Sequence, residues 1–438
     1  MRPEHGGGAL ELEGDILDFS SNINPLGPSD RVLGCLDKKK IEHYPPAYSP
    51  LLRKKIAGYL NVNVENITVG NGSAELIKDF CSTFLSREKS AVVLEPTFAE
   101  YSRFAKIYGK NVTHILPNTE FCFTNEDVLK TLNTDNGLIF ICRPNNPTGH
   151  SIPENDLDTI IEHAKKDNIL VFLDEAFIEF SNIKSYTDRV NEFKNLFVLR
   201  SFTKFYAIPG LRAGYGVGSK EIISKLENQR VPWNVNTIAQ DATILSLSDK
   251  DYPLKTKNFI SREKEFLKKG IEELGIKVYD SKVNFLLLRH CWKSKNLKKR
   301  LLMEGLLIRD CSTFKGLDER YVRVSVRTRD DNKKLINSLD KALKEGIDKG
   351  ENCYYYPCHF KGQDCTFCFC LFYPCMDKIL GKMITGRHEN KIWTCKNCNK
   401  IHTPRIVEAL VEELKGEVVQ GLDEEGKAKL WKFFKQQI

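Results

Sequence analysis

The stretch RSFTKFYAIPGLRAGY, residues 200–215, determines the fold that we expect for this chain. It contains one lysine, Lys204, among apolar, small and hydroxyl residues, and Arg212 follows eight positions later, past a Pro-Gly pair. The preceding run LFVLR (196–200) has the continuous apolar composition of a buried strand. Surface lysines normally lie in solvated, charge-mixed segments, and this lysine does not. By itself, a lysine in a loop after a strand is usually a surface residue, so a chemical role for Lys204 depends on the other motifs of the chain.

The composition is that of an ordinary soluble protein. The chain has 438 residues, enough for two or three domains, with 41% hydrophobic and 28% charged residues. Its net charge of +8 comes from lysines that alternate with acids in helix-like segments such as 261–274, which favours solvated helix faces over a nucleic-acid-binding stripe. We find neither an apolar run of the roughly 18–20 residues that a membrane helix needs nor the apolar region of a signal peptide. We therefore expect a cytoplasmic protein with no nucleic-acid or membrane partner.

Short apolar runs alternate with amphipathic ones over the first part of the chain. Strand–helix alternation predicts an α/β domain with a mostly parallel sheet, and residues 154–168 are typical of one of its helices. After about residue 255 the pattern loosens into a smaller α+β domain, which a helix over 331–347 closes. The candidate strands are 67–70, 91–95, 138–142, 169–174, 196–200 and 213–218 in the first domain, and 283–289, 306–310 and 321–327 in the second.

Polar residues follow several of these strands. In an open parallel sheet, ligands bind at the carboxyl ends of the strands. GNGSAE (70–75) opens a helix whose N-terminus could hold a phosphate. PNNPTG (144–149) follows another strand, Asp174 ends a third, and Ser201, Lys204 and Arg212 follow a fourth. An anion cradle, an acid, a lysine and an arginine are the groups that pyridoxal 5′-phosphate requires.

At this point the chain resembles a known group of enzymes, the fold-type I pyridoxal-phosphate enzymes of the aspartate-aminotransferase superfamily. Within that group it is most similar to the threonine-phosphate decarboxylases of cobalamin biosynthesis. The similarity covers about residues 4–345. It rests on EHGGG (4–8), LDFSSNINPLGP (17–28), residues 43–53, VGNGSAELI (69–77), RPNNPTG (143–149), LDEAFIEF (173–180), SFTKFYAIPGLRAGY (201–215), VPWNVN (231–236) and LLIRDC (306–311).

The resemblance implies a role for individual residues. Lys204 matches the lysine that forms the Schiff base with the cofactor, Asp174 the partner of the pyridine nitrogen, and Asn146 the asparagine that bonds the ring hydroxyl and borders the substrate carboxylate. The phosphate cradle is matched by Gly72, Ser73, Ser201 and Arg212. Tyr44 matches the tyrosine that reaches the neighbouring subunit's phosphate, which implies a homodimer with shared sites. Arg323 matches the arginine that binds the α-carboxylate, and His5 and Arg309 match residues around the substrate's phosphate.

The implied fold is α/β, a pyridoxal-phosphate-dependent transferase fold of type I with a cysteine-rich tail. Its expected parts are an N-terminal arm (1–30), a large cofactor-binding domain (31–255), a small domain (256–347) and the tail with terminal helices (351–438). The implied reaction is decarboxylation of L-threonine O-3-phosphate to (R)-1-aminopropan-2-yl phosphate, with serine phosphate as a second substrate because it differs by one methyl group. Phe177 stands where aminotransferases often have tyrosine, and the decarboxylase pattern also has phenylalanine there.

The cysteines are concentrated in the tail. Of the fourteen, six are spread over residues 1–350, whereas eight lie between residues 353 and 398. Two Cys-x-x-Cys pairs have the spacing at which two thiolates bind one metal, and eight thiolates suit two sites holding zinc or an iron–sulfur cluster. The candidate ligands are Cys353, Cys358, Cys365, Cys368, Cys370, Cys375, Cys395 and Cys398. A disulfide framework is the alternative, although reducing conditions in the cytoplasm disfavour it. Thr403 and Pro404 predict the start of a helix over 403–416.

Other interpretations stay open at this point. Asp174 could cap a helix, Arg309 and Arg323 could form surface ion pairs, Tyr44 could only pack, and His5 could belong to a disordered end. The enzyme alternative is a histidinol-phosphate aminotransferase, and an alternative of another class is a non-catalytic, metal-binding interaction protein. The tail could stabilise the chain, bind other enzymes of the cobamide pathway, act as a regulator, or supply the substrate as a threonine kinase, although we find no G-x-x-x-x-G-K-[ST] loop.

Overall fold

The computed structural model describes residues 6–34, 38–118, 120–290, 293–344, 378, 382–385, 391–394, 400, 403–414 and 424–437. The chain divides into two compact units. The first contains Met1–His290 and Lys298–Leu339, and the second contains Cys291–Leu297 and Asp340–Ile438. The four-part division predicted from the sequence stays a prediction.

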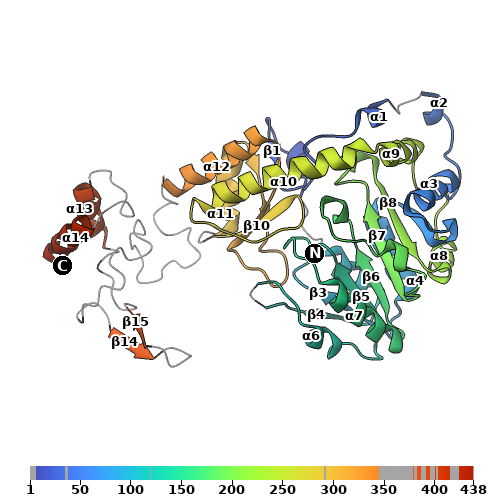
Figure 1. Cartoon of the computed structure of the whole chain (residues 1–438), viewed down its shortest axis with the longest axis horizontal. Helices are drawn as coiled ribbons and strands as arrows, with labels where there is room; N and C mark the ends of the chain where they lie inside the picture. The colour runs from blue at the N-terminus through green and yellow to red at the C-terminus, as the bar shows by residue number, and fades with distance from the viewer. Residues whose placement is uncertain are drawn as a thin grey trace. The chain divides into compact units, whose positions relative to one another are not determined.

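The main sheet of the first unit has the strand order β2-β8-β7-β6-β5-β3-β4 among the described residues. Strand β8 runs antiparallel to both of its neighbours, and the remaining pairs are parallel. This confirms the predicted mixed, mostly parallel sheet (Figure 1). The strands are β2 (Ile67–Asn71), β3 (Ser90–Leu94), β4 (Val112–Ile115), β5 (Asn136–Cys142), β6 (Leu170–Asp174), β7 (Leu196–Ser201) and β8 (Ala213–Gly218).

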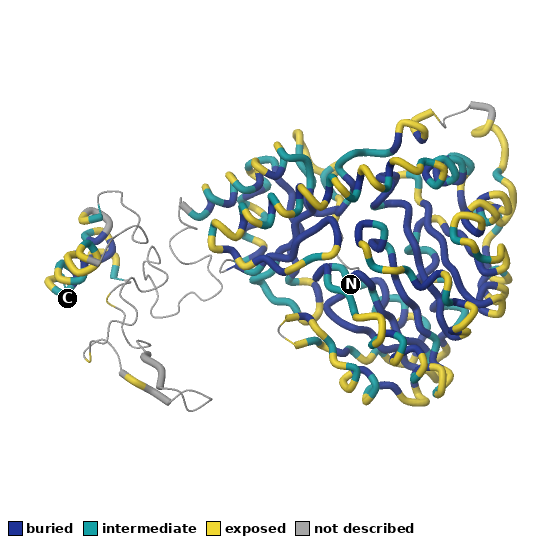
Figure 2. Tube along the Cα trace, viewed as in Figure 1, coloured by how far each residue is buried: buried dark blue, intermediate teal, exposed yellow. Residues whose placement is uncertain are grey.

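The central strands are buried because helices cover them. All residues of β3, β7 and β8 are buried, and Figure 2 shows the sheet as a dark interior beneath partly exposed helices. Phe80 packs its ring against Phe172 and Phe197 at centroid distances of 5.0 and 4.7 Å. These rings belong to a core cluster that α4, α5 and α8 complete with apolar side chains. The fully apolar strands seen in the sequence are therefore those that lie inside the sheet.

Several helices within residues 30–344 begin at local signals in the sequence. Ser29, Thr124, Ser219 and Asn236 each accept a backbone N–H of the first turn with the side chain and so cap a helix. The helices are α1 (Asp30–Leu33), α2 (Lys38–Ile41), α3 (Pro50–Leu60), α4 (Ser73–Phe84), α5 (Glu100–Tyr108), α6 (Asn125–Leu129), α7 (Glu154–Lys166), α8 (Lys220–Glu227), α9 (Thr237–Ser248), α10 (Asp251–Glu272), α11 (Ser294–Met303) and α12 (Arg329–Lys344).

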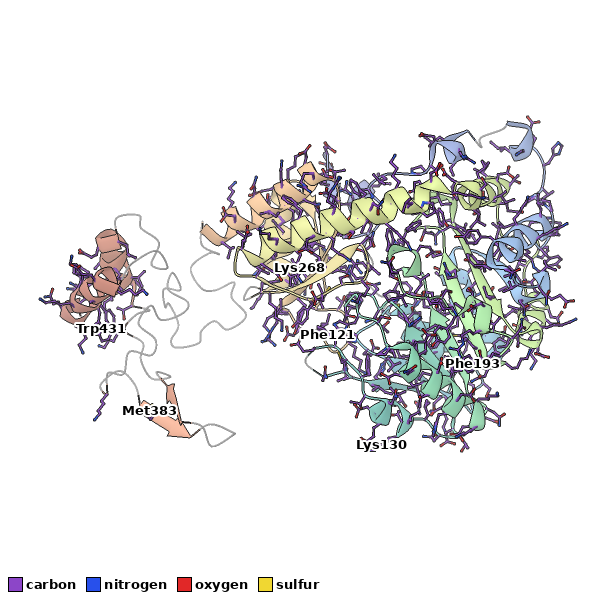
Figure 3. All side chains as sticks on the ribbon, in the orientation of Figure 1. Phe121, Lys130, Phe193, Lys268, Met383 and Trp431 are labelled. Carbon is purple, nitrogen blue, oxygen red and sulfur yellow. The ribbon has the colours of Figure 1, made fainter. Side chains whose placement is uncertain are left out.

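A smaller antiparallel sheet has the order β12-β13-β10-β9. Its strands are β9 (Lys277–Val278), β10 (Phe285–Arg289), β12 (Arg309–Asp310) and β13 (Tyr321–Ser325). Arg309 lies directly opposite Arg323 in this sheet. A separate apolar cluster, which includes Phe121 and Phe314, packs on the sheet, and Phe121 (labelled in Figure 3) contacts Tyr279 edge to face at 4.9 Å. The predicted strand 306–310 is interrupted, because residues 306–307 form β11 and pair elsewhere.

The N-terminal segment joins this smaller sheet to the main one. Strand β1 (Leu17–Asp18) pairs in parallel with β11 (Leu306–Leu307). The Phe19 carbonyl then accepts the Ser325 N–H at 2.8 Å, and the Asn24 N–H donates to the Lys204 carbonyl at 3.0 Å. Residues 17–24 therefore lie against both sheets.

The second unit contains a hairpin and a helix pair among its described residues. Strands β14 (Lys382–Thr385) and β15 (Lys391–Thr394) are antiparallel. Helix α13 (Pro404–Leu414) packs on α14 (Glu424–Gln437) through a small apolar cluster, and Trp431, labelled in Figure 3, lies 5.5 Å from Phe434 on α14. The predicted helix 403–416 is observed over nearly its whole length. In the described parts of the chain, no helix is long and apolar enough to span a membrane.

Candidate active site

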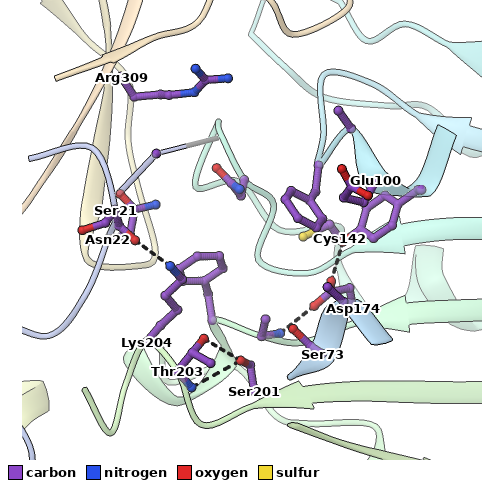
Figure 4. Close-up of a pocket in the computed structure, with 18 of the residues that line it drawn as sticks. Ser21, Asn22, Ser73, Glu100, Cys142, Asp174, Ser201, Thr203, Lys204 and Arg309 are labelled. Atoms are coloured by element: carbon purple, nitrogen blue, oxygen red, sulfur yellow. Dashed lines mark hydrogen bonds between the residues drawn. The ribbon is translucent and has the colours of Figure 1, made fainter. Parts of the chain in front are cut away.

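A cavity of about 490 Å³ opens in the first unit where several strands of the main sheet end. Strands β6 and β7 and the loops after β3 and β5 contribute residues to its walls, and the smaller sheet closes one side. Eight residues predicted from the sequence line this cavity: Ser73, Asn146, Asp174, Ser201, Lys204, Arg212, Arg309 and Arg323. Figure 4 shows Lys204, Ser201, Asp174 and Arg309 around the same space. The fold therefore brings together residues far apart in the sequence, since Ser20 and Arg323, 303 positions apart, both line this cavity.

Lys204 is an amine kept weakly basic. Its Nζ donates to the Ser21 carbonyl oxygen at 2.7 Å (Figure 4). Burial lowers the pKa of Lys204 to about 8, and the positive charges of Arg323 and Arg212 act in the same direction. Near neutral pH a useful fraction of this amine is therefore unprotonated and nucleophilic, as a carbonyl-attacking lysine requires.

Asp174 is a buried carboxyl at the end of β6. Its Oδ2 accepts the Tyr101 hydroxyl at 2.5 Å, and its Oδ1 accepts the Ala176 N–H at 2.8 Å. Burial raises the pKa of Asp174 to about 6, whereas both hydrogen bonds oppose that rise because they stabilise the ionised form. The Ala176 bond closes a local turn, and the next helix, the 3-10 turn Ile178–Phe180, has Phe177 and not Asp174 at its N-cap.

An anion cradle lies at the N-terminus of α4. Gly72 has φ +79°, a left-handed conformation that glycine adopts freely. A Cβ atom at Gly72 would lie 2.3 Å from Nη2 of Arg212, and one at Gly214 would lie 2.6 Å from the Ser73 N–H nitrogen. Glycine at position 72 leaves room for the Arg212 guanidinium, and glycine at position 214 leaves room for the N-terminus of α4. Ser201 and Thr203 add hydroxyl groups 2.9 Å apart, so the cradle suits a phosphate group.

These residues fit pyridoxal phosphate. The cradle offers backbone N–H groups, hydroxyls and a guanidinium to a phosphate, and the buried Asp174 carboxyl can accept the proton of a pyridine nitrogen. Lys204 faces the same cavity. Among the described residues, its Nζ donates to a backbone carbonyl and to no carboxylate. The donor and acceptor set is therefore the one that this cofactor requires, with each group on a different element.

Two buried arginines form the opposite wall. Nη2 of Arg323 donates to the Ser20 carbonyl at 2.5 Å, and Nη1 donates to Oδ1 of Asn146. Burial lowers the pKa of Arg323 to about 10, and the charge of Arg309 adds to this effect. Nη2 of Arg309 donates to Oγ1 of Thr313 at 2.9 Å, and its guanidinium lies over the Phe314 ring. Both arginines face the cavity and not the solvent, so they provide positive charge for a ligand.

An aromatic wall accompanies these charges. Phe177 lines the cavity, and its ring lies edge-on to Phe285 at 5.2 Å. Phe98 lines it from the loop after β3, where its ring meets Tyr101 edge-on at 5.7 Å. With phenylalanine at position 177, that point of the wall carries no hydroxyl to donate a hydrogen bond.

Some predicted residues lie elsewhere. Tyr44 does not line the cavity of its own chain; its side chain is 82% exposed, and its ring packs on Trp233 at 5.1 Å. His5 and the eight candidate metal ligands, from Cys353 to Cys398, lie outside the described residues. Within the part of the chain that is described, no group of three or more candidate ligands surrounds a metal position.

The sequence interpretation missed several residues of the cavity walls, among them Tyr101 and Asn22. Tyr101 holds Asp174 from the first turn of α5, and Asn22 lies in the N-terminal segment beside the acceptor of Lys204. Tyr101 follows β3 in EPTFAEY, so its position after a parallel strand was the available indication. Asn22 stands within the LDFSSNINPLGP motif, but nothing in that motif indicates which side chain faces the cavity.

Comparisons with known proteins agree with this geometry. Residues 14–339 match the family described as Aminotransferase class I and II, and residues 345–424 match the family described as Cysteine-rich small domain. A protein of Caldanaerobacter subterraneus subsp. tengcongensis named "Putative threonine-phosphate decarboxylase" is 38% identical, over 79% of this chain and 96% of that protein.

Two solved structures have the same fold over the first unit. The histidinol-phosphate aminotransferase from Clostridium acetobutylicum superposes with a TM-score of 0.71 at 32% identity, covering 76% of this chain and all of the other. The L-threonine-O-3-phosphate decarboxylase from Porphyromonas gingivalis superposes with a TM-score of 0.67 at 26% identity, covering 74% of this chain and 99% of the other.

The hydrogen bond between Tyr101 and Asp174 predicts a pH effect. Tyr101→Phe removes a donor to the ionised carboxylate, so the pKa of Asp174 rises above its value of about 6. A hydrogen bond to a charged group is worth roughly 1.5–3 kcal/mol, which corresponds to a rise of about one to two pH units. A protonated Asp174 cannot pair with a protonated pyridine nitrogen. As the solution is acidified, Tyr101→Phe should therefore lose affinity for pyridoxal phosphate at a higher pH than the wild type does.

The measurement is the dissociation constant of pyridoxal phosphate between pH 5 and 9, a range that spans the pKa of Asp174 at about 6, for the wild type and Tyr101→Phe. Tyr215→Phe is the matched control, since it removes another buried phenol that does not contact Asp174. Identical pH profiles for all three proteins would contradict the assignment.

Proposed function

From the premise that this chain belongs to the aminotransferase class I and II family, we propose that it decarboxylates L-threonine O-3-phosphate to (R)-1-aminopropan-2-yl phosphate and CO₂. The product would serve as the aminopropanol linker in cobamide biosynthesis. The family implies pyridoxal phosphate as the cofactor. When bound, that cofactor supplies an electron-accepting ring that weakens the bonds at the α-carbon of an attached amino acid.

The observation that carries the proposal is the pair of cationic side chains in one cavity. Arg309 and Arg323 are opposite each other in the β12–β13 pair, both are 4% exposed, and both line the cavity. Two buried guanidinium groups at one site favour a substrate with two anionic groups. An amino acid phosphate carries two such groups, a carboxylate and a phosphate, and the cavity that both arginines line has a volume of about 490 Å³.

Substrate orientation then selects the bond that breaks. When bound, the cofactor would accept the electrons of one bond to the α-carbon, and the residues that hold the substrate would decide which bond that is. In our proposal, Arg323 and Asn146 bind the α-carboxylate, and Arg309 binds the phosphate, together with His5. Holding both ends of the substrate fixes rotation about the α-carbon, so binding energy from the remote phosphate is used at the reacting carboxylate.

Lys204 has the proton-transfer role in this proposal. With a pKa near 8, its Nζ gains and loses a proton readily at neutral pH. After CO₂ leaves, the ammonium form of Lys204 delivers a proton to the α-carbon. Asp174 remains ionised through the Tyr101 and Ala176 hydrogen bonds and keeps the ring nitrogen protonated.

The second candidate is a histidinol-phosphate aminotransferase, which the likeness to the Clostridium acetobutylicum enzyme favours. The greater identity to the Caldanaerobacter protein and the phenylalanine at position 177 support the decarboxylase instead.

The reaction is tested by supplying L-threonine O-3-phosphate and trapping CO₂. We expect CO₂ from this substrate, slower release from L-serine O-phosphate with a difference of no more than about 200-fold for one methyl group, and no keto product from histidinol phosphate with 2-oxoglutarate. Lys204→Ala should abolish CO₂ release, and borohydride reduction followed by peptide mapping should label Lys204. Keto product without CO₂ would reject the decarboxylase in favour of the second candidate.

We further propose that the site is completed by a second copy of the chain. Enzymes of this fold type are typically homodimers. Tyr44 is 82% exposed and its ring packs at a tilt against Trp233, and the exposed apolar residues Ile41, Leu51 and Val231 lie in the same segments of the chain. An exposed surface of this kind suits a partner subunit, whose phosphate cradle Tyr44 would reach.

A mixing experiment tests this shared site. The Tyr44→Ala and Lys204→Ala homodimers should both be nearly inactive, since each lacks one of the two side chains at both of its sites. After exchange of subunits, half of the dimers are hybrids in which one site has both an intact Lys204 and a partner with intact Tyr44. Activity should therefore recover to about a quarter of the wild-type value. Activity of the mixture equal to the average of its two parents would contradict a site shared between subunits.

For the tail, we propose that the eight cysteines from Cys353 to Cys398 bind zinc or an iron–sulfur cluster. The match of residues 345–424 to a cysteine-rich small domain supports a separate unit, but it does not identify the metal. Thiolate ligands suit both kinds of centre.

Metal analysis of the purified full-length protein tests the tail. With four thiolates per ion, we expect about two zinc ions per chain, or iron with acid-labile sulfide and broad visible absorption. Replacing Cys395 and Cys398 together by serine should reduce the metal content, whereas Cys122→Ser, which alters an exposed free cysteine of the first unit, should not. A metal-free protein whose tail cysteines are oxidised to disulfides would overturn this assignment.

A further inference from the structure

A buried carboxyl, that of Glu95, lies behind the cavity wall and has no role in the proposed reaction. The residue follows β3 directly, is 4% exposed and does not line the cavity. Its backbone N–H donates to the Ile115 carbonyl at 2.9 Å, which extends the pairing of β3 with β4. A buried carboxyl is costly unless neighbouring groups stabilise it, so the contacts of this one indicate what it does.

Both oxygens of the Glu95 carboxyl hold groups of neighbouring segments. Oε2 accepts the Thr97 N–H at 3.0 Å, within the loop that carries Phe98 into the cavity wall. Oε1 lies 2.9 Å from Nδ1 of His114 on β4 and accepts the Ser102 hydroxyl of α5 at 3.3 Å. The carboxyl therefore joins β4, the loop after β3 and the first turn of α5.

The loop after β3 is tied in turn to the loop after β5, residues 143–149. The Thr97 hydroxyl donates to Oδ1 of Asn145 at 2.9 Å, and Nδ2 of Asn145 donates back to the Pro96 carbonyl at 2.8 Å. The next residue along the chain, Asn146, lines the cavity. A shift of the loop after β3 therefore disturbs the support of Asn146.

Helix α5 carries a second group of the site. Ser102, which donates to Glu95, directly follows Tyr101. The Tyr101 hydroxyl donates to Oδ2 of Asp174 at 2.5 Å. One carboxyl behind the wall is therefore connected to the acid of the site through α5, and to Asn146 through the loop after β5.

We propose that Glu95 is a positioning residue: from behind the cavity wall, its carboxyl keeps the loop after β3 and the first turn of α5 in the arrangement that the reaction requires. It acts through Asn146 and Tyr101, since Glu95 itself does not line the cavity. The effect on catalysis rests on the proposed function, whereas the effect on the two loops does not.

The charge of Glu95 changes near neutral pH. Burial raises the pKa of Glu95 to about 7, although its hydrogen bonds and the charges of Lys315 and Lys106 oppose that rise. Burial lowers the pKa of His114 to about 4, and the same two lysines act in the same direction. A neutral imidazole can donate or accept through Nδ1, so the contact with His114 survives when Glu95 ionises. The hydrogen bond from the Thr97 N–H becomes stronger with a carboxylate acceptor, so rising pH should tighten the loop.

Four variants separate positioning from general stability. Glu95→Ala removes the hydrogen bonds, whereas Glu95→Gln keeps the size of the side chain and an acceptor oxygen but cannot ionise. Thr97→Val removes only the hydroxyl that reaches Asn145 and keeps the N–H that Glu95 accepts. Glu263→Gln is the matched control, because Glu263 is also a buried carboxyl, 1% exposed, but lies on α10 away from the cavity and accepts Arg329.

Hydrogen exchange of the full-length, cofactor-loaded protein, followed by mass spectrometry, reports the positioning directly. In Glu95→Ala we expect exchange faster by about 10-fold or more in peptides spanning 95–101 and 143–150, because the Thr97 N–H loses its acceptor. Between about pH 6 and 8, on either side of the pKa of Glu95 at about 7, protection of residues 95–101 should rise in the wild type and stay constant in Glu95→Gln. Glu263→Gln should exchange in these peptides as the wild type does.

Steady-state kinetics with L-threonine O-3-phosphate measure the consequence for the reaction. Glu95→Ala should lower kcat about 10- to 100-fold with a smaller change in KM, because displaced groups of the site cost rate. Thr97→Val should lower kcat in the same sense, and the double variant should lose less than the product of the two effects, because both act on one chain of hydrogen bonds. Glu263→Gln should keep the wild-type kcat even where its melting temperature falls.

The outcomes decide the inference separately from the proposed function. Wild-type exchange in both peptides together with a wild-type kcat in Glu95→Ala would overturn the inference, and so would faster exchange spread evenly over the whole chain. If Glu95→Ala does not fold, the same pH dependence of protection in the wild type and Glu95→Gln, with a wild-type kcat in Thr97→Val, overturns it. If the wild type releases keto product from histidinol phosphate and no CO₂, the proposed function is wrong, and the exchange experiment still decides the role of Glu95.

Discussion

The site depends on the hydrogen bond between Lys204 and the Ser21 carbonyl, made in surroundings that disfavour a charged amine. Burial and two nearby arginines lower the pKa of Lys204 to about 8, and the structure places a neutral carbonyl, not a carboxylate, at 2.7 Å from Nζ. A carboxylate in that position would restore a high pKa and keep the amine protonated. The neutral acceptor orients the amine while leaving it able to react.

Burial also shifts the pKa of Asp174, the acid of the site, but it raises this pKa whereas it lowers that of Lys204. The pKa of Asp174 rises to about 6, so the buried acid and the buried amine titrate closer to each other than free side chains do. Tyr101 then matters because its hydroxyl counteracts the effect of burial on the acid. At one solution pH, the cavity therefore holds an ionised carboxylate on one wall and a partly neutral, reactive amine on another. Acid–base chemistry near neutrality needs this combination.

Much of this arrangement could be predicted from the sequence, because it follows from local patterns. The buried strands are continuous apolar runs, and Asp174, Ser201 and Lys204 come directly after such runs, so their convergence was foreseeable. Strand β4 was missed because VTHI is short and only partly buried. The predicted strand 306–310 divides in two because Leu306 pairs with Leu17, a partner that no local pattern reveals. The contact between Tyr101 and Asp174 joins residues 73 positions apart and could not be predicted from the sequence for the same reason.

The N-terminal segment also connects the two sheets where they line the cavity. Residues 17–22 pair with β11 at one end and bind Arg323 and Lys204 through adjacent carbonyls at the other. A ligand that draws Arg323 toward itself competes with the Ser20 carbonyl for the guanidinium. Because the Ser21 carbonyl belongs to the next residue, a shift of this backbone also changes the hydrogen bond that orients Lys204. Arg323 and Lys204, to which the proposed function assigns substrate binding and the reacting amine, are therefore coupled through a short length of chain.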